Sequence, residues 1–206
     1  MKKMNVKVNV AAALLAGALF VPAAMASTTS VIDFNELTSD DTYFVDPLIS
    51  GGFNFTNNCI SSSNCLGVWG KDHVAQADPG HAAIFVNSGF TITSMNRTDG
   101  GTFNLISIDL ADAYNSGESS TIDFTFYHSG VATTSQSVTL DNLIGLQTFV
   151  FNETNLTSVS WQTSIGDGGY GQFDNVLVSS VPEPEIYAML LVGLGLVGFT
   201  SRRKKV

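Results

Sequence analysis

Residues 121–128 read Thr-Ile-Asp-Phe-Thr-Phe-Tyr-His, and this stretch decides the fold class. Ile122, Phe124 and Phe126 alternate with polar residues, and a β-strand places every second side chain on the same face. The three apolar side chains then share one face, and the polar ones between them face water. The pattern therefore predicts a half-buried strand.

Similar runs recur along the chain at intervals of roughly ten residues, separated by Gly, Asn and Asp. They cover residues 31–34, 53–56, 82–86, 90–93, 103–110, 131–140, 148–151, 158–163 and 173–178. No convincing helical period occurs between residues 27 and 180. We therefore predict an all-β fold, a single antiparallel, jelly-roll-like β-sandwich, whose core is filled mainly by the fourteen Phe of the chain.

The N-terminus has the parts of a secretory signal peptide. Three lysines within the first seven residues precede an apolar run over 8–21, and Ala-Met-Ala at 24–26 fits the A-x-A cleavage pattern. The run is short, because a membrane span needs roughly 20 residues. We expect residues 1–26 to enter the secretory translocon and to be removed by signal peptidase. A retained membrane anchor is the alternative.

Residues 181–206 combine three features. They are, in order, Pro182-Glu183-Pro184, an apolar stretch over 186–199, and a basic end of Arg202, Arg203, Lys204 and Lys205. The prolines prevent a helix from starting upstream, so we expect a transmembrane helix over about 185–200 with the basic end, 202–205, in the cytoplasm. The domain before it then lies outside the cell membrane. A plain single-span anchor has the same pattern.

The three features in this order resemble the PEP-CTERM sorting signal of Gram-negative bacteria that make extracellular polysaccharide. The resemblance implies recognition by an exosortase, a membrane-embedded cysteine transpeptidase that cuts near the Pro-Glu-Pro. It also implies a precursor anchored in the inner membrane, followed by a place at the cell surface or in the extracellular matrix. It says nothing about the function of the exported domain.

The region between the two ends, residues 27–180, has the length of one domain. Sixteen acidic side chains face only two basic ones in it, Lys71 and Arg97. This balance opposes binding to nucleic acid or to anionic lipid, since both need basic patches. It is consistent with cation binding and also with a merely solvated acidic surface.

Cys59 and Cys65 are the only cysteines. They lie in a polar stretch of an exported chain, without a neighbouring motif for metal binding or catalysis. We therefore predict a disulfide bond that closes a small loop.

A catalytic set is not apparent, and we expect a non-catalytic protein. His73 and His81 share a loop with Asp72 and Asp78, but their spacing matches no known metal-ligand motif. No Gly-x-Ser-x-Gly elbow is present. A carboxylate pair for glycoside hydrolysis stays open, because its separation depends on the fold.

The early run Val-Ile-Asp-Phe-Asn at 31–35 and the final run Gln-Phe-Asp-Asn-Val at 172–176 bracket the domain. In this it resembles the galactose-binding-like jelly rolls common among sugar-binding modules. The resemblance implies that the first and last strands are neighbours and that Asp33, Asn35 and Asp174 supply oxygen ligands to a structural Ca²⁺. The alternative is that Asp174 and Asn175 only hydrogen-bond a buried loop.

A sugar site needs exposed aromatic rings with polar neighbours. Trp69 and Tyr170 lie in Gly-rich stretches and are the candidates, whereas Trp161 lies on a patterned strand and is expected in the core. Three functions remain open. The first is a surface protein that binds extracellular polysaccharide, the second is a structural or adhesive protein without a small ligand, and the third is a carbohydrate-active enzyme.

Overall fold

A computed structural model describes residues 28–37, 42–45, 47–59, 65–88, 91–112, 114–164 and 171–181, with residues 190, 191, 193–195 and 198 of the tail. The signal peptide 1–26, the Pro-Glu-Pro at 182–184 and the basic end 202–205 lie outside the described residues, as does Tyr170. No helix in the described part of the chain is long and apolar enough to cross a membrane. The transmembrane helix expected over 185–200 is therefore not confirmed.

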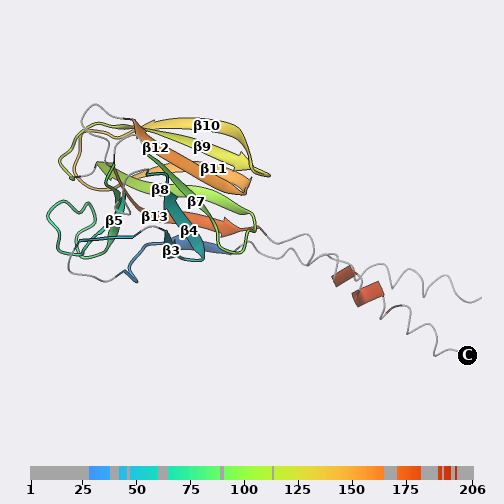
Figure 1. The fold of residues 1–206 in the computed structure, drawn as a ribbon. Helices are drawn as coiled ribbons and strands as arrows, with labels where there is room; N and C mark the ends of the chain where they lie inside the picture. The colour runs from blue at the N-terminus through green and yellow to red at the C-terminus, as the bar shows by residue number, and fades with distance from the viewer. Residues whose placement is uncertain are drawn as a thin grey trace, which may run out of the picture.

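The domain is a sandwich of two antiparallel sheets (Figure 1). The strands of the described residues are β1 (Thr29–Ile32), β2 (Tyr43–Phe44), β3 (Leu48–Ser50), β4 (Phe53–Asn57), β5 (Leu66–Trp69), β6 (Ala83–Val86), β7 (Ile92–Arg97), β8 (Phe103–Asp112), β9 (Thr121–His128), β10 (Val131–Thr139), β11 (Gln147–Leu156), β12 (Ser158–Ser164) and β13 (Gly171–Ser180). One sheet has the order β11-β8-β13-β6-β5-β2, with β1 also paired to β13, and the other has the order β10-β9-β12-β7-β4-β3. The predicted all-β sandwich is confirmed.

The core lies between the two sheets and is largely aromatic. On β9, Ile122, Phe124 and Phe126 are buried as the alternation predicted, and Trp161 from β12 is buried beside Phe124. Every buried member of this core lies between Ile32 and Val178. The domain therefore contains its complete core and is expected to fold without either end of the chain.

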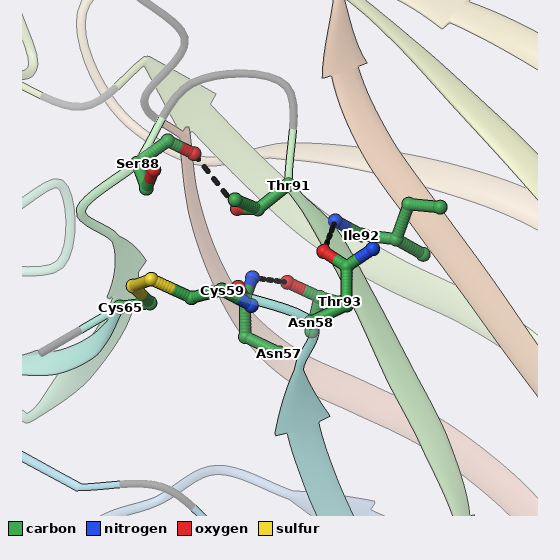
Figure 2. The surroundings of a disulfide bond; sticks show 8 residues. All are labelled: Asn57, Asn58, Cys59, Cys65, Ser88, Thr91, Ile92 and Thr93. Carbon is green, nitrogen blue, oxygen red and sulfur yellow. Dashed lines mark hydrogen bonds between the residues drawn. A yellow bond between two sulfur atoms is a disulfide. The ribbon is translucent and has the colours of Figure 1, made fainter. Parts of the chain in front are cut away.

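A disulfide joins the two sheets. Cys59 follows β4 in the six-stranded sheet, and Cys65 precedes β5 in the seven-stranded sheet, with their Cα atoms 6.1 Å apart. Figure 2 shows the bond beside the start of β7, where the Asn58 side chain accepts a hydrogen bond from the backbone N–H of Ile92 at 2.7 Å. The predicted disulfide is confirmed, and it fixes the chain where it crosses from one sheet to the other.

The first and last strands are neighbours, as the resemblance implied. The last strand, β13, pairs with β8 along one side, whereas two strands share its other side. There, β6 pairs with residues 172–173 and β1 pairs with residues 176–179. Between them, Asp174 and Asn175 have no strand partner on that side among the residues that the structure describes, and a bulge interrupts the pairing with β8 at the same place. This interruption in the sheet, which we call the β13 gap, locates the first candidate site.

Candidate functional site

The β13 gap brings the three predicted calcium ligands to one region. The last pair between β1 and β13 joins Ile32 to Val176, and the next residue of β1, Asp33, is close enough to Asp174 to act on its charge. The backbone N–H of Asn35 donates to the Oδ1 of Asp33 at 3.3 Å. Phe34 then adopts a left-handed backbone with φ of 52° while its ring is fully buried against Phe55 and Phe173. Such a conformation costs a non-glycine residue about 1–2 kcal/mol. It is held here by the packing of the ring.

Asp174 is a carboxyl group in an unfavourable environment. Its side chain is only 1% exposed. Burial is the main cause that raises the pKa of Asp174 to about 8; the nearby carboxylates of Asp78, Asp33 and Asp109 contribute to this rise, and one hydrogen bond from the backbone N–H of Asn175 opposes it. A cation bound here would reverse this effect, because positive charge favours the ionised carboxylate.

A second unsatisfied group lies two residues after Asp33. The Oδ1 atom of Asn35 is buried and has no hydrogen-bond partner among the described residues. An unpaired buried acceptor costs about 1–3 kcal/mol, and amide and carboxylate oxygens are the ligands that Ca²⁺ takes. The oxygen atoms of Asp33, Asn35 and Asp174 are thus of the types that bind calcium. However, the described residues contain no group of three or more Asp, Glu, His or Cys close enough to hold a metal ion, so a cation would depend on amide or carbonyl oxygens as well.

Asp112 is a carboxylate of the same domain that, unlike Asp174, accepts several hydrogen bonds. It is also buried, and burial alone raises its pKa, but the backbone N–H groups of Ser116, Gly117 and Tyr114 donate to it and bring the pKa below the ordinary value. Its oxygens accept these bonds at 2.9 to 3.0 Å. Asp112 therefore stabilises a turn, whereas Asp174 is left without comparable donors.

Gln172 fastens a long loop to the outer face of the seven-stranded sheet. Its Oε1 accepts from the N–H of Ala77 at 3.1 Å, and its Nε2 donates to the carbonyls of Ala75 and Asp112. The glutamine is 1% exposed. The loop over residues 70–82 is thereby held against the sheet, and it forms part of the second candidate site.

The second candidate site is an aromatic group on this outer face. Trp69 lies between two parallel rings, with His73 on one side and Phe85 on the other, each at 3.9 Å between centroids. Phe44 meets Phe85 edge to face at 5.9 Å. We call these four residues the outer aromatic group. Gly67 makes the stack possible, because a Cβ atom there would lie 2.3 Å from the ring of Phe85.

The exposure expected for Trp69 is wrong. Its side chain is 9% exposed, because it ends a strand rather than lying in an open loop and because His73 covers its outer side. Phe44, by contrast, is 40% exposed. The indole Nε1 of Trp69 is buried without a hydrogen-bond partner in the described part of the chain. Tyr170, the other candidate, lies outside the described residues.

The two histidines of the 70–82 loop serve different purposes. His73 stacks on Trp69, and the Nδ1 of His81 lies 2.9 Å from the Oδ2 of Asp78. They are not part of a metal-binding cluster among the residues described.

Some residues of both sites were missed at the level of sequence. Asp109 belongs to the alternating run 103–110, where its outward position was readable but its proximity to Asp174 depends on strand pairing. Phe85 belongs to the run 82–86, which is buried throughout because the 70–82 loop covers the outer face. An unbroken apolar run of this kind signals a strand covered on both faces.

Comparison with known proteins supports both the sorting signal and the fold. Residues 180–204 match the PEP-CTERM protein-sorting motif. The chain thus carries the signal of a secreted, membrane-anchored precursor that is sorted to the cell surface. No curated protein matches the chain in sequence.

The solved structures to which this chain is similar include a DUF4465 family protein and carbohydrate-binding modules. A DUF4465 family protein from Bacteroides caccae has a TM-score of 0.57 at 13% identity, covering 75% of this chain and 100% of that one. A family 29 carbohydrate-binding module from Piromyces equi has a TM-score of 0.43 at 10% identity, covering 76% and 92%. The family 32 module of NanJ from C. perfringens, solved with galactose, has a TM-score of 0.42 at 15% identity, covering 73% and 99%. The TM-score of the DUF4465 family protein supports a likeness of fold.

Proposed function

We propose that the domain is a non-catalytic surface protein that binds extracellular polysaccharide through the outer aromatic group. The observation that carries this proposal is the position of these rings. The main core between the sheets is complete without Trp69 and Phe85, which form a separate cluster on the outside of a sheet with Ala75. Aromatic rings on an outer sheet face, close to a polar loop, are suited to the apolar faces of sugar rings.

The unpaired indole of Trp69 supports the same proposal. A buried N–H without an acceptor costs about 1–3 kcal/mol, and a sugar hydroxyl offers the missing acceptor. Phe44 supplies exposed ring surface, and His73 supplies a polar ring that can reorient over the indole. A ligand would therefore contact both Phe44 and His73.

The test is affinity electrophoresis of residues 27–181 against a panel of bacterial matrix polysaccharides, followed by calorimetry with any that retards the domain. Phe44→Ala and His73→Ala are expected to reduce affinity about tenfold each, the equivalent of 1.4 kcal/mol. Val74→Ala is the matched control, because Val74 lies in the same loop and is 96% exposed. Equal effects of all three variants, or no retardation by any polymer, would leave the structural or adhesive role as the better explanation.

We further propose that an exosortase processes the tail at or near the Pro-Glu-Pro. The match over residues 180–204 supports this. Replacement of Pro182, Glu183 and Pro184 by Ala in the full chain is expected to leave an uncleaved precursor in the membrane fraction of the native host. Deletion of Arg202, Arg203 and Lys204 tests the basic end separately. Unchanged release of the first variant would contradict the proposed processing.

Finally, we propose a structural calcium ion at the β13 gap, held by Asp33, Asn35 and Asp174. The unpaired Oδ1 of Asn35 and the buried carboxyl of Asp174 support it. Calcium is expected to raise the melting temperature of the wild-type domain relative to EDTA and to leave Asp174→Ala unchanged. Asp141→Ala is the control and should still respond, because Asp141 is exposed and is not among the carboxylates that act on Asp174. An identical melting temperature of the wild-type domain with calcium and with EDTA would refute the proposed calcium site.

A further inference from the structure

The edge strands of the two sheets differ in how well they are protected against pairing with a strand of another molecule. On one side of the sandwich the seven-stranded sheet ends in β2, of two residues, and the six-stranded sheet ends in β3, of three residues. Strands this short offer little backbone for pairing with another chain. This side of the domain is therefore closed to further strand addition.

On the other side, the seven-stranded sheet ends in β11, which is long but irregular. Its pairing with β8 shifts at two places, and Asn152 and Asn155 have left-handed backbones there. It also carries the charged side chain of Glu153. Bulges and charges are the usual means by which edge strands avoid pairing with other molecules.

The strand β10, at the same side of the six-stranded sheet, lacks these protections (Figure 1). It has nine residues, Val-Ala-Thr-Thr-Ser-Gln-Ser-Val-Thr, without charge or proline, and all but Val138 are exposed. Its single register shift lies at its start, between Ala132 and Thr134, so the stretch from Thr134 to Thr139 is regular. A long, uncharged, regular edge of this kind is a template for another strand.

We propose that two copies of this domain pair through β10, antiparallel and about a two-fold axis at Gln136, to form one continuous twelve-stranded sheet from two six-stranded ones. A two-fold interface uses the same surface on both copies, which suits a strand that pairs with itself. With this axis Ser135 lies opposite Ser137 of the second copy, and Gln136 lies opposite its own counterpart. Such polar pairs hydrogen-bond across strands and contribute about 0.2–1 kcal/mol each.

The charge pattern also favours a second copy at this strand. The domain as a whole is strongly acidic, which keeps copies apart over most of its surface. The acid nearest the axis is Asp123 on β9, which lies opposite Ser137 and accepts a hydrogen bond from its hydroxyl at 2.5 Å. In the dimer the two Asp123 side chains are three strand spacings apart, about 14 Å, which exceeds the screening length of about 8 Å at physiological salt.

The first arm of the test is sedimentation equilibrium of residues 27–181 from micromolar to near-millimolar concentration. A reversible dimer is expected, and Ser135→Lys should weaken it about tenfold, since Lys on an edge opposes strand pairing. Thr148→Lys is the matched control, because it adds the same charge to an exposed position of the other long edge, β11. A monomer at all concentrations, or equal weakening by both lysines, overturns the proposal.

The second arm is independent of how the lysine variants fold. The two cysteines of the chain are already bonded to each other, so Gln136→Cys introduces one free thiol at the proposed axis. Under mild oxidation this variant should form a covalent dimer much faster than Thr148→Cys, since directly opposed Cβ atoms lie about 4.5–5.5 Å apart. Equal rates for the two variants would refute pairing through β10. Neither arm depends on whether the domain binds a glycan.

Discussion

Replacement of Asp174 by Asn should make the domain more stable at alkaline pH. In the folded domain, burial and the surrounding carboxylates raise the pKa of Asp174 from 3.8 to about 8. The folded state therefore keeps a proton that the unfolded state has already lost. Each unit of difference corresponds to 1.36 kcal/mol, so the full shift represents about 6 kcal/mol of stability lost between the pKa of the unfolded state and that of the folded state. Asn keeps an acceptor for the Asn175 N–H and carries no charge.

The sign of the pH dependence follows from the raised pKa. Below about pH 4 both states hold the proton, and Asp174 imposes no penalty. As the pH rises toward 8 the unfolded state gains relative to the folded state by about 1.4 kcal/mol per unit. Above about pH 8 the folded carboxyl ionises as well, and the difference becomes constant. The free energy of unfolding of the Asn variant lacks this slope. The two proteins should therefore be similarly stable at low pH, and the Asn variant should become increasingly more stable than the wild type as the pH rises.

Urea unfolding of residues 27–181 in EDTA, at several pH values between 4 and 9, measures this divergence. Asp123→Asn is the control, because that acid is exposed on β9 and should leave the slope unchanged. Repeating the series with calcium should flatten the wild-type curve if a cation compensates the Asp174 charge. A gap between wild type and Asp174→Asn that stays constant from acid to alkaline pH in EDTA would refute the environment assigned to this carboxyl.

Three further substitutions test the packing around the sites by the same unfolding assay. Gly67→Ala should cost about 2–3 kcal/mol, since the new methyl meets the rigid ring of Phe85 at 2.3 Å; a neutral effect would mean that the outer stack is loose. Cys65→Ser should cost about 2 kcal/mol by releasing the short loop to Cys59, and reduction of the wild type should match it. Gln172→Leu removes three buried hydrogen bonds and should cost about 3 kcal/mol, with faster proteolysis in the 70–82 loop as a second readout.

Local pattern was sufficient to predict much of the fold. The alternation of Ile122, Phe124 and Phe126 required only that one face of a strand be buried, and the structure buries all three. The disulfide followed from two cysteines in a polar stretch of an exported chain, and it is present. These predictions succeed because period and composition act within a few residues. They do not depend on which strand lies beside which.

The second candidate site depended on long-range contacts, and for this reason its exposure was misjudged. Trp69 lies beside Gly70, so its ring was expected in an open loop. Its environment is set instead by Phe85, which follows it by sixteen positions, and by His73 folding back over the indole. Gly67 was readable only as a loop glycine, whereas its function is to leave room for the ring of Phe85. The spacing of residues in the sequence does not show which side chain of a neighbouring strand needs the room that a glycine leaves.

The two candidate sites are mechanically connected through β13. Gln172 fixes the loop that carries His73, and Asp174 lies two residues further along the same strand, with Asp78 of that loop among the charges that act on it. A cation at the proposed site in the β13 gap would relieve the repulsion between Asp174 and Asp78 and so stabilise the loop in its observed position. Because the loop covers Trp69, its position also determines how much of the outer aromatic group a glycan can reach. If both proposed ligands bind, occupancy of one site would therefore change the free energy of binding at the other, and by linkage the effect would be the same in both directions.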